Sequence, residues 1–199
     1  MEFWFEFGST YSYPAAFRVE EAAGNAGVEL VWRPFLLGPI FKEQGWNDSP
    51  FNIYPAKGRY MWRDLERICE ELQIPLRQPS QFPRNGLLAS RVACLFEAER
   101  WVPEFVRRVY LANFGYDRDI SKSAEIASIL KALDLPADLL SAAESPESKA
   151  KLRAQSERAG ALGIFGAPTF VSESEIFWGN DRLETAITWA QRHERARSG

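Results

Sequence analysis

Patterns typical of β-strands occur near the two ends of this chain and leave a long middle without them. Residues 2–7 alternate, with their phenylalanines on one face, and stop at a glycine. Residues 10–26 then repeat apolar side chains at helical spacing, and residues 28–34, "VELVWRP", predict a second strand. Strands joined through a helix are parallel and connected by a right-handed crossover. The chain therefore begins with a βαβ unit.

The middle of the chain has a different character. A loop rich in glycine, proline and asparagine is predicted from Leu37 to Tyr54, and its length favours a function over mere connection. Helical patterns follow at residues 55–72, 86–99, 103–114 and 121–133, with a short helix from residue 136. We therefore interpret this middle part as a helical domain.

Strand patterns return only near the C-terminus. "PTFVS" and "EIFW" are separated by the turn-like Glu173-Ser174, and a final helix is predicted from Asp181. A βαβ unit followed by a hairpin and a helix closes into one small mixed sheet. This arrangement resembles an α/β thioredoxin-like fold, formed by residues 1–36 and 150–199, with residues 37–149 as an inserted all-helical domain.

Composition excludes several classes of function. The formal net charge of -3, from 24 basic and 27 acidic residues, gives no field that would attract nucleic acid or an anionic membrane. The first residues lack the features of a signal peptide, so we expect a cytoplasmic protein. Cys69 and Cys94 lie among apolar neighbours as structural thiols, and the single histidine, His193, gives no support for a metal site.

The junction between the first strand and the first helix carries the stretch "GSTYSYPA". Dithiol oxidoreductases have Cys-x-x-Cys at such a junction, whereas this chain has Ser9 and Ser12, which excludes disulfide chemistry through this motif. The helix N-terminus can still stabilise an anion, including a thiolate that a ligand brings in. The alternative is that Ser9 only caps the helix, which is the commoner role of serine there.

Four separated stretches resemble one known group of proteins. They are "FEFGSTYSY", "WRPFLLGPIFKEQGWND" with "YPAKGRYMWRDL", "GIFGAPTFV", and "FWGNDRLE". Together they are similar to the kappa-class glutathione transferases and 2-hydroxychromene-2-carboxylate isomerases, a DsbA-like branch of the thioredoxin superfamily. The family usually has proline after its first serine, where this chain has Thr10.

The resemblance implies a set of site residues. Ser9 would be catalytic, its hydroxyl holding the thiolate of glutathione. Pro168 would be cis, and Ala167 before it would offer its backbone N–H and C=O to the extended glutathione chain. A trans proline that merely limits a strand is the alternative.

Three further residues would hold the rest of glutathione. Asn180 and Asp181 match the positions that bind its γ-glutamyl end, although both are also good caps for the following helix. Asn47 matches an asparagine near the sulfur, although it also suits a turn. Lys42, Lys57 and Arg33 could meet an anionic substrate. Several aromatic residues could form an aryl-binding pocket, namely Tyr11, Phe35, Trp46, Phe51, Tyr54 and Trp62.

The function that the resemblance implies is glutathione-dependent cis-trans isomerisation of an unsaturated aromatic keto acid, by a homodimer. Two alternatives stay open: a kappa-type transferase, which would consume glutathione, and a non-catalytic module that binds thiols or peptides on a redox-inactive fold.

Overall fold

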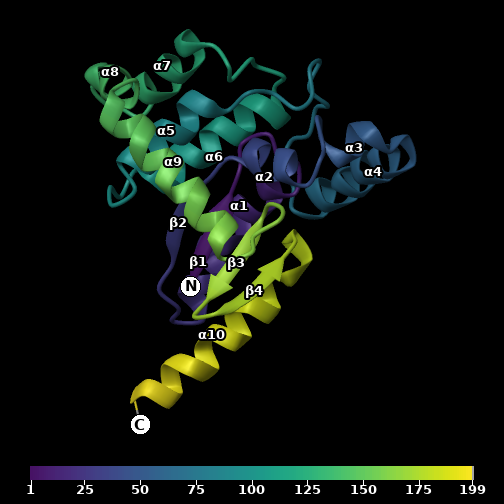
Figure 1. Ribbon diagram of the computed structural model, residues 1–199, viewed down its shortest axis with the longest axis vertical. Helices are drawn as coiled ribbons and strands as arrows, with labels where there is room; N and C mark the ends of the chain where they lie inside the picture. Colours follow the sequence, from purple (N-terminus) through teal and green to yellow (C-terminus); the bar gives the residue numbers. More distant parts are fainter. Residues whose placement is uncertain (199) are drawn as a thin grey trace.

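The computed structural model describes residues 1–198 and has one four-stranded sheet near its centre (Figure 1). The strands are β1 (Glu2–Phe5), β2 (Val31–Pro34), β3 (Thr169–Ser172) and β4 (Glu175–Trp178), in the order β2-β1-β3-β4. β1 pairs parallel to β2, with Phe3 opposite Trp32, and antiparallel to β3, with Phe3 opposite Phe170. The expected mixed sheet is confirmed.

Two helices of the terminal segments pack on this sheet. They are α1 (Ser12–Asn25), which connects β1 to β2, and α10 (Leu183–Ser198), which follows the 3-10 turn Asn180–Arg182. Fully buried rings of Phe3, Phe5 and Phe7 fill the space between the sheet and the helices. α1 ends before Gly27, whose φ of +68° is a conformation that glycine adopts without strain.

Eight α-helices lie between β2 and β3 within the described chain. Their bounds are α2 (Leu37–Glu43), α3 (Pro50–Ile53), α4 (Pro55–Glu71), α5 (Leu87–Leu95), α6 (Val102–Tyr110), α7 (Ser123–Lys131), α8 (Asp138–Ala143) and α9 (Pro146–Ala161). A π-helical turn, Leu111–Gly115, extends α6. The helical insertion is thus confirmed. α9 crosses the expected boundary at residue 149, so the position of that boundary stays a prediction.

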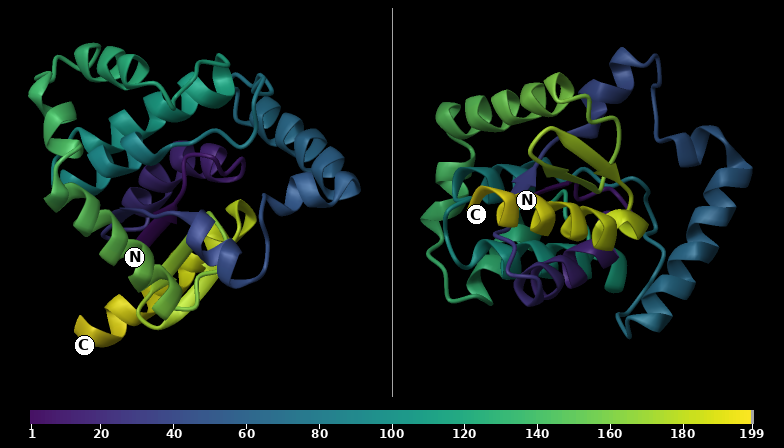
Figure 2. Two further views of the ribbon diagram at one scale, coloured as in Figure 1. Left: turned by 45° about the horizontal axis from the view of Figure 1, so that its top comes forward. Right: turned by 90° about the horizontal axis from the view of Figure 1, so that it is seen from below.

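Figure 2 shows how the inserted helices are distributed around the sheet. α5 to α8 lie on the face that carries Phe3 and Phe5, where α6 contacts α1, whereas α9 lies on the other face, where Ala159 packs in one cluster with Trp4 and α9 contacts α2. α3 and α4 stand apart from the other helices, and we call this pair the α3–α4 arm. The two helices pack closely against each other, because a Cβ on Gly58 would lie only 2.3 Å from the Phe51 carbonyl oxygen. No helix within residues 1–198 has the length and apolarity needed to cross a bilayer.

The prediction of one continuous loop from residue 37 to 54 was wrong. Leu37 and Ile40 are buried against Ala159 and Ile164, and this burial stabilises the short helix α2. α3 begins at Pro50 and is capped by Ser49, whose hydroxyl accepts the Phe51 N–H. The sequence analysis also missed α9, because that helix is largely polar. Its start does carry a signal, since the Ser145 hydroxyl accepts the Ser148 N–H and Pro146 follows.

Candidate functional site

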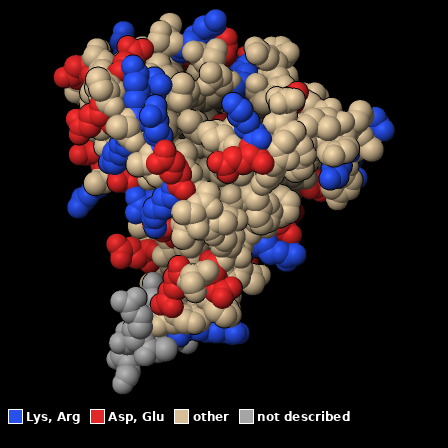
Figure 3. Space-filling model, in the orientation of Figure 1, with Lys and Arg blue, Asp and Glu red and all other residues tan. Residues whose placement is uncertain are grey.

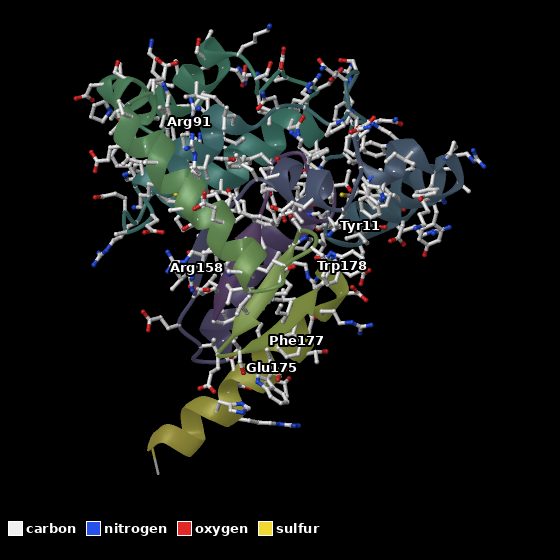
Figure 4. The ribbon with its side chains drawn as sticks, in the orientation of Figure 1. Tyr11, Arg91, Arg158, Glu175, Phe177 and Trp178 are labelled. Atoms are coloured by element: carbon white, nitrogen blue, oxygen red, sulfur yellow. The ribbon has the colours of Figure 1, made fainter. Side chains whose placement is uncertain are left out.

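A cavity of about 990 Å³ lies between the end of the sheet and the α3–α4 arm. Its walls come from the Gly8–Tyr11 turn, the loop before β3, the end of β4, α2, and the loop before α5. Tyr11 and Trp178, both labelled in Figure 4, lie on this side of the molecule, whereas Arg158 and Glu175 lie away from it. Figure 3 shows that uncharged surface dominates this face. The cavity is at the upper end of the size range of small-molecule sites.

Ser9 lies in the cavity wall at the turn that leads into α1. Its hydroxyl donates a hydrogen bond to the Ala167 carbonyl oxygen at 2.8 Å, which joins residues 158 positions apart. The Ser9 hydroxyl oxygen also accepts the Ser12 N–H, at a long 3.4 Å. Ser9 therefore makes only a weak cap for the helix, and its main partner is the loop before β3.

The loop before β3 forms the opposite side of the same corner. The Ala167-Pro168 peptide bond is cis, as the resemblance implied, and it directly precedes β3. Ala167 lines the cavity, whereas Pro168 lies outside the described wall. Gly166 allows the Trp178 indole to approach, because a Cβ there would lie 2.4 Å from the ring nitrogen. Trp178 also packs on Phe165, with ring centroids 4.9 Å apart. Ala167, whose backbone was expected to bind glutathione, lies at the cavity, but its carbonyl already accepts the Ser9 hydroxyl.

Glu6 is a cavity residue to which the sequence analysis assigned no role. It follows β1, and its carboxylate Oε2 accepts the Gly8 N–H at 2.9 Å. Burial raises the pKa of Glu6 from its usual 4.5 to about 7, while hydrogen bonds from the Gly8 and Ser9 backbone act in the opposite direction. A strand-end carboxyl three residues before Ser9 was visible in the sequence, but its burial was not.

Distant segments hold this strand end in place. The Tyr110 hydroxyl on α6 donates to the Glu6 carbonyl at 2.9 Å, and the Asn113 amide donates to the Phe7 carbonyl at 3.1 Å. Arg84, which is buried in the loop before α5, forms an ion pair with Asp117 and lines the cavity. The sequence analysis gave no role to this loop, which carries a second cis bond, Phe82-Pro83.

The α3–α4 arm is tied to the start of α1 by two side-chain contacts. The Tyr11 hydroxyl donates to Asp64 Oδ2 at 2.9 Å, and burial, with a contribution from Asp64, raises the pKa of Tyr11 well above its usual value. The Thr10 hydroxyl donates to the Met61 sulfur at 2.9 Å. Thr10, the departure from the family pattern, therefore serves to attach α4 beside the cavity. Ser12 is fully buried and does not contribute to the described cavity wall.

Asn180 and Asp181 both line the cavity, where the end of β4 leads into the 3-10 turn. Asn180 is buried, and its side-chain oxygen accepts a hydrogen bond from Arg18 at 2.9 Å. The Asp181 side chain is 75% exposed. The expectation that one of them caps the helix was wrong: Gly179 begins the 3-10 turn without any side-chain cap. Gly179 has a φ of +116°, and the Asp181 carboxylate occupies the space of its missing Cβ.

Asn47 is exposed and borders the cavity from the segment between α2 and α3. Among the three suggested cations, the structure places only Lys57 in the cavity wall, with its ammonium 4.9 Å from the centre of the Tyr54 ring. Arg33 instead forms ion pairs with Glu2 and Glu97 on another part of the molecule. Lys42 is exposed and outside the described wall.

Three of the six aromatic residues suggested for an aryl-binding pocket line the cavity. Tyr11, Trp46 and Phe51 line the cavity, whereas Phe35 is fully buried in the core and Trp62 packs on Phe82. Tyr54 is exposed and does not belong to the described wall. Further aromatic residues of the wall were not identified from the sequence, namely Phe41, Phe82, Phe165 and Trp178.

Known relatives share this architecture and most of this length. The chain is 29% identical over 187 residues to 2-hydroxychromene-2-carboxylate isomerase of Sphingobium xenophagum, covering 92% of this chain and 94% of that protein. It is 27% identical over 172 residues to human glutathione S-transferase kappa 1, covering 79% and 75% of the two chains.

A solved structure of a 2-hydroxychromene-2-carboxylate isomerase superposes with a TM-score of 0.87 at 23% identity, covering 99% of this chain and 97% of that chain. The family of the DSBA-like thioredoxin domain matches residues 1–187. This match spans the sheet, the inserted helices and the cavity corner around Ser9. The chain belongs to the DSBA-like thioredoxin domain family.

Proposed function

We propose that this protein is a glutathione-dependent cis-trans isomerase of the 2-hydroxychromene-2-carboxylate type. The observation that carries the proposal is the corner at which the Ser9 hydroxyl, 2.8 Å from the Ala167 carbonyl, and the start of α1 border a large cavity. The likeness to a 2-hydroxychromene-2-carboxylate isomerase and to a kappa-class glutathione transferase supports glutathione as the cofactor.

The residues of the cavity fit glutathione, which carries an ammonium, two terminal carboxylates and a central thiol. Ser9 offers a hydroxyl that can turn from the Ala167 carbonyl toward a sulfur. The exposed Asp181 carboxylate suits the ammonium, and Asn180 next to it suits the neighbouring carboxylate. Asn47 lines the same cavity. When bound, glutathione would supply the nucleophilic sulfur that makes a conjugated double bond temporarily single.

The chain's own residues would orient the second substrate. The cavity is at the upper end of the size range of small-molecule sites, and aromatic rings from α2, α3 and the segment between them line it, among them Phe41, Trp46 and Phe51. Lys57 is a cation of that wall which forms no ion pair within the described chain, and it suits the carboxylate of an aromatic keto acid. Ser9 and the N–H groups that begin α1 would favour negative charge on the sulfur.

A kappa-type transferase is the second candidate, and the likeness to human glutathione S-transferase kappa 1 is the observation that favours it. It would use the same residues and release a conjugate. A non-catalytic thiol-binding module would use Ser9 and Ala167 without turnover.

One experiment separates these functions. The protein is mixed with a 2-hydroxychromene-2-carboxylate and glutathione well below the substrate concentration. An isomerase brings the substrate to its equilibrium ratio with the product, turning over far more substrate than there is glutathione, and leaves glutathione intact; Ser9→Ala slows it at least about a hundredfold. A transferase stops when glutathione is consumed, and a binding module shows no conversion in either protein. Either of these outcomes would overturn the proposal.

A further inference from the structure

The Glu6 carboxyl lies three residues before Ser9 and is partly buried at the cavity, and the proposed reaction does not yet use it. It borders the cavity, with Oε2 2.9 Å from the Gly8 nitrogen. The Ser9 N–H donates to the Glu6 main-chain carbonyl at 3.0 Å. A Cβ on Gly8 would lie 3.0 Å from Glu6 Oε2, so the carboxylate lies directly against the turn that presents Ser9.

None of the described elements around Glu6 supplies a cation that pairs with its carboxylate. Tyr110 on α6 donates to its main-chain oxygen, and Arg84 before α5 is paired with Asp117. The other charged residues of the cavity are Asp48, Lys57, Asp64 and Asp181. Within residues 1–198 Glu6 forms no ion pair, and its described carboxylate partners are backbone N–H groups. A negative charge at this turn is therefore stabilised only by dipoles.

A thiolate held at Ser9 would be a second negative charge at the same turn. Like charges in a partly buried site oppose each other, and each raises the pKa of the other. Burial has already brought the pKa of Glu6 to about 7, close to the pH at which a thiol would have to ionise for the proposed reaction. The two groups are therefore matched for exchange of one proton.

We propose that Glu6 is a catalytic residue that shares one negative charge with the thiol bound at Ser9. As the thiol S–H bond breaks, an O–H bond forms on the Glu6 carboxylate, and the charge moves from the carboxylate to the sulfur. The reverse transfer returns the proton. This role rests on the proposed glutathione site and adds a proton acceptor to it, while the Gly8 hydrogen bond keeps the Ser9 turn in place in both states.

The test is a pH titration of the ultraviolet thiolate absorbance of the glutathione-loaded protein. Wild type is compared with Glu6→Gln, whose amide oxygen can still accept the Gly8 N–H. The control is Asp64→Asn, which removes a cavity carboxylate that binds Tyr11 instead of the Ser9 turn. We expect two titration steps in wild type and in Asp64→Asn. Glu6→Gln should give one step, with its midpoint lower by about one pH unit.

Coincident single-step curves for wild type and Glu6→Gln would overturn the inference while leaving the glutathione site intact. Absence of any saturable thiolate signal in wild type would overturn the proposed function and this inference with it. A measurement on wild type alone covers the case that Glu6→Gln does not fold: the carboxyl ¹³C signal of Glu6 should titrate at higher pH with glutathione than without it. An unchanged midpoint would also overturn the inference.

Discussion

Replacing Glu6 with glutamine should change how the stability of the protein depends on pH, even without any ligand. The pKa of Glu6 is about 7 in the folded protein, against 4.5 in an exposed carboxyl, because burial disfavours its charged form. The folded state therefore holds this proton more tightly than the unfolded state. Stability from this group is complete below pH 4.5 and is lost as the pH rises to about 7.

The size of the effect follows from the difference between the two pKa values. At about 1.4 kcal/mol for each pH unit, ionising Glu6 costs the folded state at most about 3–4 kcal/mol. The carboxyl borders the cavity and retains some access to water, so this figure is an upper limit. Glutamine cannot ionise and keeps an oxygen for the Gly8 N–H. Glu6→Gln should therefore gain stability relative to wild type between pH 4.5 and pH 8.

The assay is urea unfolding of both proteins at several pH values across that range, followed by circular dichroism. The control is Glu175→Gln, at an exposed position on β4, which should shift the free energy of unfolding by less than about 0.5 kcal/mol at every pH. If the wild-type and Glu6→Gln stabilities stay parallel from pH 4.5 to pH 8, Glu6 ionises like an exposed carboxyl and the reasoning fails.

Four other substitutions test the packing around the site and the role of Lys57. Tyr11→Phe removes the hydrogen bond to Asp64 and should lower the free energy of unfolding by about 1 kcal/mol in urea titrations; no change would show that the arm is held without it. Gly86→Ala places a Cβ 2.5 Å from the Phe7 side chain and should lower the free energy of unfolding by roughly 1–3 kcal/mol. Gly24→Ala adds a Cβ where α1 has open space and should raise that free energy slightly. Equal effects of the two substitutions would contradict the packing at Gly86. Lys57→Met should raise the KM for a carboxylated aromatic substrate about tenfold or more with little change in kcat, and an unchanged KM in steady-state kinetics would exclude Lys57 from substrate binding.

Much of the fold could be predicted because its strands have simple local patterns. The alternation in residues 2–7 and the paired runs around the Glu173-Ser174 turn gave β1, β3 and β4 nearly in full. α9 was missed because several of its buried residues are polar, among them Ser148 and Gln155, so apolar periodicity is weak there. α2 forms where burial against α9 and the loop before β3 outweighs a loop-like composition.

The candidate site was only partly predictable for a related reason. Ser9, Ala167 and Asp181 stand out because they belong to motifs that can be recognised one segment at a time. The position of Glu6 depends instead on a segment about a hundred residues away, because the Tyr110 hydroxyl on α6 donates to its main-chain carbonyl. The Asn180 side chain likewise has a partner, Arg18, that no local pattern indicates.

The central claim is that Ser9 and the start of α1 activate the thiol of glutathione. The most direct measurement is a titration of glutathione into the protein near neutral pH, with ultraviolet detection of the thiolate, for wild type, Ser9→Ala and the exposed control Ser174→Ala. The account predicts a saturable thiolate signal in wild type and Ser174→Ala that weakens at least about tenfold in Ser9→Ala. An equal signal in all three proteins, or none in wild type, would contradict it.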